Sequence, residues 1–448
     1  MKQANNGFFF EEFFGLILSP FERFLRRTTA GGIILIVTVV ISLALANSRP
    51  GREIFSIWEQ QLTVGIASWQ LQFSLHQWVN EGLMTLFFLL VGLELKRELI
   101  VGELSSIRDA SLPIIAALGG MIVPAMIYSA INPAGLAARG WGVPMATDIA
   151  FAVGILVLLG RRIPAGLTVF LTAVAIADDL GAVIVIAFFY TGTIAFSALF
   201  AAAVLLVLLF ILNRGGIRNP FPYAFIGLLL WFSLLRSGVH PTIAGILLAC
   251  SIPAKSTFTP PQFAQRIEQL QDELGGEATD PYACDNALSC PRMIKVAENL
   301  EHAARAVQSP QQHMEHTLSP WVTFVILPIF AFSNLGIDFS KLGWNAALSP
   351  IALGVALGLI AGKLIGISTF SFIAVKIGIS RLPRGITWKQ IIGVAWLGGI
   401  GFTMSLFIGN LAFADPDSLE AAKIGILAAS LTAGTVGLAW LRFACGKG

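Results

Sequence analysis

Long apolar segments recur along almost the whole chain, and they constrain the fold more than any other feature of the sequence. Each is about 20 residues long, the length at which a helix crosses the hydrocarbon core of a bilayer. Of the 448 residues, 56% are hydrophobic and only 12% are charged, whereas soluble domains carry roughly 25% charged residues. The sequence therefore predicts an all-α polytopic membrane protein, because a soluble protein of this size would need a charged surface.

Twelve segments fit a membrane span, three of them shorter than the others. The predicted spans are residues 29–48, 82–100, 111–131, 143–160, 166–190, 194–213, 221–236, 239–253, 319–337, 350–375, 390–412 and 420–442. Most of the 29 Lys and Arg residues lie on one side of the membrane if the N-terminus is inside. The positive-inside rule then predicts that both termini are cytoplasmic.

The predicted spans divide the chain into four parts. Residues 1–28 have acidic side chains in an apolar stretch and no small-residue cleavage site, so we interpret them as a cytoplasmic amphipathic segment rather than a signal peptide. Residues 29–253 hold eight spans, 254–318 form a long polar cytoplasmic loop with some helix, and 319–443 hold four spans.

The outer segment at about 50–78 separates the first two predicted spans. Within it, residues 60–75 partly alternate polar and apolar side chains, which favours a strand or a hairpin. A plain extended loop fits this pattern equally well.

Two adjacent carboxylates, Asp178 and Asp179, are the only charged residues between Arg162 and Arg214. A helix that begins near residue 166 reaches Asp178 after roughly 18 Å, close to the middle of the bilayer. An ionised Asp at that depth costs about 2.5–3.5 kcal/mol, and intramembrane carboxylates usually mark an ion or proton path. A carboxylate binds either H⁺ or a hard cation such as Na⁺. Competition for the pair would couple the two ions; a purely structural, protonated pair is the alternative.

Two other intramembrane charges support an ion site. Asp148 follows Thr147 in a span that Pro144 weakens, and a helix break there is tolerable only around a cavity or a protein-buried centre. The alternative is an Asp that caps a shorter helix. Lys363 adjoins a row of glycines at every fourth position, which favours close helix packing. It needs a counter-charge, for which the Asp pair is the candidate, and a plain salt bridge between helices would also explain it.

The glycine-rich span "IIGVAWLGGIGFTMSLFIGN" is a second interrupted segment, in the opposite half of the chain. Two interrupted spans in opposite halves are typical of inverted-repeat transporters. Seven motifs then carry a specific resemblance: "FFLLVGLELKREL", "ATDIAFAVG", "AIADDLGA", "SGVHPTIAG", "ILPIFAFSNLGI", "AGKLIGIS" and "GIGFTMSLFI". From about residue 14 to 443 the chain resembles the NhaA-type Na⁺/H⁺ antiporters of bacterial inner membranes.

The resemblance implies twelve helices in inverted-topology repeats, with the fourth and eleventh unwound and crossing near the site. It implies that Asp178 and Asp179 bind the ion, with Asp179 the more direct ligand. Thr147 and Asp148 match the unwound segment, and Lys363 matches a lysine that pairs with the aspartates or releases a proton.

The function implied is a secondary antiporter that exports Na⁺ or Li⁺ in exchange for H⁺, electrogenic and regulated by pH. It would be no enzyme, need no cofactor and bind no nucleic acid. It would be a multi-pass inner-membrane protein in contact with lipid, and a homodimer paired through residues 60–75.

The resemblance also points to a cytoplasmic pH-sensing cluster. Its members would be Glu94, Arg97, Glu98, Glu315 and His316, and His240 could also titrate near neutrality. A solvated helix end explains Glu94 and Glu98 equally well. The loop supplies a second Glu-His pair, Glu301 and His302, so the assignment to Glu315 and His316 depends on the Ser-Pro-Trp that follows them.

Other functions fit the residues less well. No Walker-type phosphate loop is present, which argues against an ATP-driven pump. An intramembrane aspartyl protease needs two carboxylates that face each other and share a proton, whereas neighbours on one helix diverge. A cation channel would conduct without coupling to protons.

Overall fold

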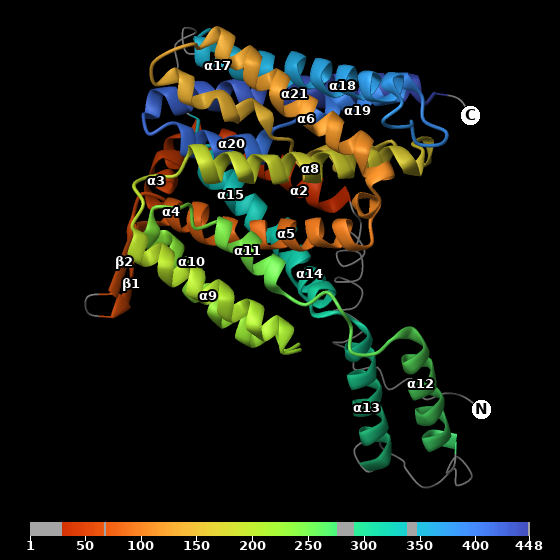
Figure 1. The fold of residues 1–448 in the computed structure, drawn as a ribbon. Coiled ribbons are helices and arrows are strands. Elements are labelled where there is room, and N and C mark those ends of the chain that lie inside the picture. Colours follow the sequence, from red (N-terminus) through yellow and green to blue (C-terminus); the bar gives the residue numbers. More distant parts are fainter. Residues whose placement is uncertain (1–28, 67–68, 276–290, 338–346, 447–448) are drawn as a thin grey trace, which may run out of the picture.

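The structure is a computed structural model that describes residues 29–66, 69–275, 291–337 and 347–446 (Figure 1). Helices dominate it, and one two-stranded sheet is the only sheet in this part of the chain. Eight helices are long and apolar enough to cross a membrane, or up to ten if each bent pair counts as one span. The prediction of an all-α polytopic protein is confirmed. The count of twelve stays a prediction, and the amphipathic segment at residues 1–28 lies outside the described residues.

The first eight predicted spans each contain helix. In chain order the helices are α2 (Thr29–Ala46), α5 (Met84–Ile100), α6 (Ile107–Ile131), α7 (Ile149–Leu158), α8 (Ala165–Phe189), α9 (Phe196–Arg214), α10 (Pro220–Ser237) and α11 (Ile243–Ser251). Two of them are much shorter than their predicted spans. Helix α11 has only nine residues. Helix α7 follows a separate 3₁₀ helix, η3 (Ala137–Met145), which contains Pro144.

The outer segment forms a hairpin, so of the two interpretations of residues 60–75 the extended loop is wrong. Helix α3 (Arg49–Ile57) precedes the antiparallel strands β1 (Gln61–Ile66) and β2 (Trp69–Ser74). The short helix α4 (Leu75–Gln77) and a π-helical turn, η1 (Trp78–Leu83), then lead into α5. The hairpin lies at one end of the bundle, opposite to the C-terminus (Figure 1).

The long polar segment 254–318 contributes to three helices in the part of it that the structure describes. Helices α12 (Pro260–Gly275) and α13 (Pro291–Val307) project from the bundle (Figure 1). Helix α14 (Pro310–Trp321) begins inside the segment that the sequence assigns to the loop, because Ser309 and Gln312 form a capping box there. It continues through η6 (Val322–Ile326) into α15 (Leu327–Asn334).

The last three predicted spans are helical. They consist of α17 (Pro350–Leu357), η7 (Gly358–Gly362) and α18 (Lys363–Ile377), then α19 (Trp388–Gly398) and α20 (Phe402–Ala412), and finally α21 (Pro416–Ala444).

Glycines bring α18 against α6, as the row of glycines predicts. A Cβ atom on Gly366 would collide with the carbonyl oxygen of Gly119, and one on Gly119 would collide with that of Gly366. Gly358 and Gly362 lie in the same way against Pro144 and Pro124. This close packing fixes Lys363, the first residue of α18, in the buried interior.

Candidate ion-binding site

Two helix breaks touch each other inside the bundle. One is the extended stretch between η3 and α7, and the other separates α19 from α20, whose axes differ by 43°. The backbone N–H of Asp148 in the first break donates to the carbonyl oxygen of Ile400 in the second, at 2.6 Å. Both interruptions predicted from the sequence are therefore present. This hydrogen bond pairs a backbone N–H group of the first break with a carbonyl group of the second. Backbone groups buried at membrane depth need such partners.

Asp148 lies at the N-termini of two helices at once. Its Oδ1 accepts the backbone N–H of Phe151 at 3.0 Å, which makes it the N-cap of α7. Its Oδ2 accepts the backbone N–H of Thr403 at 3.0 Å and the Thr403 hydroxyl at 2.5 Å, in the first turn of α20. A carboxylate there offsets the partial positive charge of both helix ends. Asp148 therefore caps α7, as one of the two interpretations of it predicts, and it also accepts hydrogen bonds from the start of α20; its role in ion binding stays a prediction.

Thr147 connects the breaks to α8. Its hydroxyl lies 2.7 Å from Asp178 Oδ2 and 2.9 Å from the carbonyl oxygen of Gly398. The hydroxyl has one hydrogen, so it donates to one of these acceptors at a time. All of these groups are buried.

Asp178 and Lys363 form a buried ion pair. The Lys363 ammonium group contacts Asp178 Oδ2, and only 1% of either side chain is exposed. Lys363 therefore has the counter-charge that the sequence requires of it. The other oxygen, Asp178 Oδ1, is buried and makes no hydrogen bond among the described residues.

The side chain of Asp179 points in a different direction from that of Asp178, because neighbouring residues on a helix are rotated by about 100°. It lines a cavity of about 280 Å³ together with Asp148, Thr403, Glu94 and Arg97. Asp179 Oδ1 is buried and has no hydrogen-bond partner in the part of the chain that the structure describes. The pair thus places one unpaired carboxylate oxygen beside Lys363 and a second in the residue that lines the cavity.

The oxygens present suit an alkali cation better than a resident transition metal. Carboxylate, hydroxyl and carbonyl oxygens are the ligands that hard cations prefer. Within the described ranges, no three His, Cys, Asp or Glu side chains are placed to hold a metal ion.

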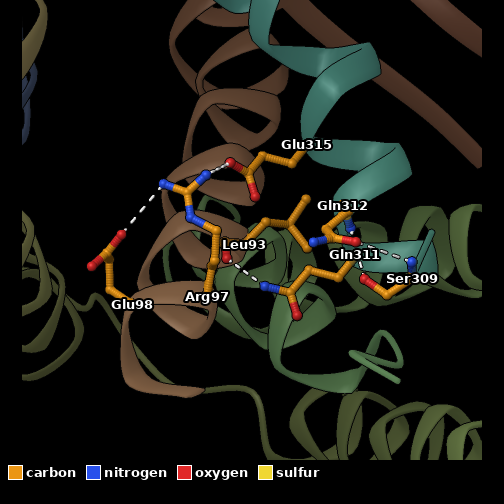
Figure 2. A network of polar contacts seen from close by, with 7 residues as sticks. All are labelled: Leu93, Arg97, Glu98, Ser309, Gln311, Gln312 and Glu315. Carbon is orange, nitrogen blue, oxygen red and sulfur yellow. Dashed lines mark hydrogen bonds and ion pairs between the residues drawn. The ribbon is translucent and has the colours of Figure 1, made fainter. Parts of the chain in front are cut away.

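A polar network joins α5 to α14 (Figure 2), and one of its members, Arg97, also lines this cavity. Arg97 forms an ion pair with Glu315, and its guanidinium lies 3.4 Å from Glu98. Gln311 Nε2 donates to the carbonyl oxygen of Leu93 at 2.8 Å. Of the two Glu-His pairs, the one with Glu315 therefore lies against Arg97, and its role in pH sensing stays a prediction.

The remaining candidate residues for pH sensing lie in different places. Glu301 pairs with Arg305 within α13, away from the network. Glu94 lines the cavity beside Asp179, and His316 is exposed on α14. His240 lies in the loop between α10 and α11, where its Nε2 bonds the carbonyl oxygen of Tyr190 at 2.8 Å. It therefore does not join the network.

Thr403 is a site residue that the sequence analysis missed. It is uncharged, so it does not stand out in an apolar span as an aspartate does. Its position could nevertheless have indicated it. Thr403 follows the second predicted break, within "GIGFTMS", just as Asp148 follows the first.

A polytopic helical protein with buried charges around two broken helices belongs to the class of secondary transporters built on discontinuous helices. Comparisons with known proteins narrow this class. Residues 22–441 match the family described as Na⁺/H⁺ antiporter 1. The chain belongs to this family, whose members are transporters rather than enzymes.

Curated relatives match over nearly their whole length. A protein of Syntrophobacter fumaroxidans named Na(+)/H(+) antiporter NhaA is 58% identical over 443 residues, which cover 99% of this chain and 94% of the relative. One of the same name from Acidithiobacillus ferrooxidans is 51% identical, with 95% and 97% covered. Na(+)/H(+) antiporter NhaA 1 of Saccharophagus degradans is 47% identical, with 96% and 93% covered.

Proposed function

We propose that this protein is an electrogenic secondary antiporter that exports Na⁺, or Li⁺, in exchange for H⁺. It acts in the bacterial inner membrane, with both termini in the cytoplasm and without a cofactor. Membership of the Na⁺/H⁺ antiporter 1 family supports Na⁺ and H⁺ as the two ions exchanged. One observation supports the site: Asp178 Oδ1 and Asp179 Oδ1 are buried, adjacent in the chain and without hydrogen-bond partners among the described residues.

The ion would bind where Asp179 meets the cavity. Asp179 is a better primary ligand than Asp148, because both oxygens of Asp148 already accept hydrogen bonds that hold α7 and α20 together. A bare cation that leaves water for a buried site needs free oxygens, and the two Oδ1 atoms are of this kind. Na⁺ and H⁺ then compete for Asp179, so loading with one ion expels the other.

Lys363 would supply the second proton of an electrogenic cycle. Exchange is electrogenic when more than one proton replaces each Na⁺. A cation that recruits Asp178 withdraws the counter-charge from Lys363, and a buried ammonium without its partner releases its proton. Asp179 and Lys363 are thus two groups that lose protons when one cation binds.

The network on α5 and α14 would carry the response to pH. Arg97 lines the cavity in which Glu94 and Asp179 lie, and it forms an ion pair with Glu315 on α14. A change of protonation in this network would change the contact between the two helices and hence access to the cavity. The outer hairpin supports a homodimer, because strands β1 and β2 form an isolated two-stranded sheet with free edges.

Exchange can be tested in inverted membrane vesicles with an imposed acid interior. Addition of Na⁺ should dissipate the pH gradient, and Asp179→Asn should abolish this response. Asp417→Asn, an exposed aspartate in the first turn of α21, is the matched control and should retain it. Exchange that persists in Asp179→Asn would reject the site, and Na⁺ flux that ignores the pH gradient would indicate a channel instead.

A further inference from the structure

A second pocket, remote from the ion site, is lined by arginines. It has a volume of about 720 Å³ and lies between the beginnings of α6 and α8 and the loop that joins α18 to α19. Arg108, Arg381 and Arg384 line it, and Asp109 is the only acidic residue among its lining side chains. The pocket therefore carries an excess of positive charge.

No ion pair among the described residues neutralises these three arginines. The ion pairs found in the described part of the chain involve other basic side chains, and none includes Arg108, Arg381 or Arg384. A guanidinium group presents up to five donors that suit the oxygens of a phosphate. Three such groups around one pocket form a site for an anion.

Two helix N-termini add to the positive potential. Helices α6 and α8, each of 25 residues, begin at the pocket, and neither N-cap residue, Ser106 or Pro164, supplies a capping side-chain hydrogen bond. Ala165 and Gly166, the first two residues of α8, line the pocket. Uncapped backbone N–H groups at a helix N-terminus bind anions, phosphate in particular.

The position of the pocket indicates a lipid as the source of the phosphate. Val169 lines the pocket and is 39% exposed, and Ile377 and Ile379, just before Arg381, are 67% and 58% exposed. Such large exposed apolar side chains belong against acyl chains. Trp388, the first residue of α19, packs edge-on against Phe372, and Trp is a residue type enriched at the headgroup level of a bilayer.

We propose that this pocket binds the phosphate headgroup of an anionic phospholipid. The phosphate lies among the three arginines and the two helix ends, and the acyl chains lie along the exposed apolar side chains next to them. Basic pockets between helices on the cytoplasmic side are suited to such headgroups. The proposal does not depend on the ion that the protein transports.

The test compares lipid binding to the full-length protein in detergent by native mass spectrometry, with phosphatidylglycerol and with phosphatidylcholine. The wild type should retain phosphatidylglycerol selectively. Arg381→Gln/Arg384→Gln should weaken that binding on the order of tenfold, since each basic side chain contributes measurably to attraction of anionic lipid. Arg266→Gln/Arg442→Gln removes the same charge outside the pocket and should bind like the wild type.

Further measurements distinguish a lipid phosphate from a free phosphate ion, and a loss of binding from a loss of folding. Millimolar inorganic phosphate should not displace the lipid; full displacement would show that the pocket takes a free anion and would overturn the proposal. Equal losses in the two double variants, or equal retention of phosphatidylcholine, would also overturn it. If the thermal midpoint of Arg381→Gln/Arg384→Gln falls below that of the wild type, Arg108→Gln alone replaces it and should show a smaller loss of the same kind.

Discussion

The carboxylate of Asp148 accepts both the backbone N–H and the hydroxyl of Thr403, a residue 255 positions further along the chain. This contact holds the N-terminus of α20 against that of α7, at the point where both spans are broken. Asp179 lies on the wall of the same cavity. Any movement that changes the angle between the two broken helices must therefore change the surroundings of the proposed ligand.

Asp148→Asn should destabilise the protein by about 2 kcal/mol. The amide keeps one acceptor oxygen, so its NH₂ group must face a backbone N–H of either α7 or α20 and leave a buried donor unpaired. Asp415→Asn is the matched control, because Asp415 caps α21 at an exposed position and asparagine caps equally well. Unfolding in a detergent titration measures both, and equal effects would show that the double cap contributes nothing special.

Removal of Lys363 should cost more than removal of the whole ion pair. Lys363→Met leaves the Asp178 carboxylate buried without its counter-charge, which costs about 3–5 kcal/mol. The double variant Lys363→Met/Asp178→Asn should recover most of this loss, because no unpaired charge remains. The same titration measures it, and a double variant as unstable as the single one would mean that the pair contributes through packing rather than charge.

Gly366→Ala should destabilise the helix pair α6–α18 by about 1–3 kcal/mol, the usual range for an overpacked interface. The new Cβ atom would meet the carbonyl oxygen of Gly119, which belongs to the backbone and cannot rotate away. Gly409→Ala in α20 is the control, since its nearest neighbour, the Leu419 side chain, would lie 3.8 Å from the Cβ. A thermal midpoint unchanged in Gly366→Ala would contradict the close approach.

His240 should make the folded protein less stable in mild acid. Burial lowers the pKa of His240 below its usual 6.5, and the hydrogen bond to the Tyr190 carbonyl offsets this only in part. As the pH falls below 6.5, the unfolded chain takes up the proton first, so stability decreases until the folded-state pKa is passed. His240→Gln should remove this contribution.

The measurement is the difference in thermal midpoint between wild type and His240→Gln from neutral pH to pH 5. As the pH falls, the thermal midpoint of the wild type should decrease relative to that of His240→Gln. Burial also lowers the pKa of His76, but His76 is present in both proteins, so its contribution cancels in the difference. A difference independent of pH would refute the assignment.

The sequence predicted the charged part of the site because charges are rare at membrane depth. Asp148, Asp178, Asp179 and Lys363 stand out in apolar spans, and the structure brings all four into one buried region. Physical reasoning also anticipated that Asp178 and Asp179 diverge, since neighbours on a helix cannot face the same way.

The sequence could not predict which distant residues meet. The ion pair between Arg97 and Glu315 joins residues 218 positions apart, and only the family resemblance suggested it. Thr403 was missed because its polarity is modest and becomes informative only when the second break lies against the first. His240 was named as a candidate for pH sensing by its titratable side chain alone, which carries no information on its place in the fold.

Competition between Na⁺ and H⁺ for the carboxylates at the broken helices is the core of the proposed mechanism. Isothermal titration calorimetry of the purified protein with NaCl, in two buffers that differ in ionisation enthalpy, measures the protons released on binding. We expect proton release in a pH range where the site is protonated, and no heat of binding in Asp179→Asn. Sodium binding without proton release at any pH would contradict it.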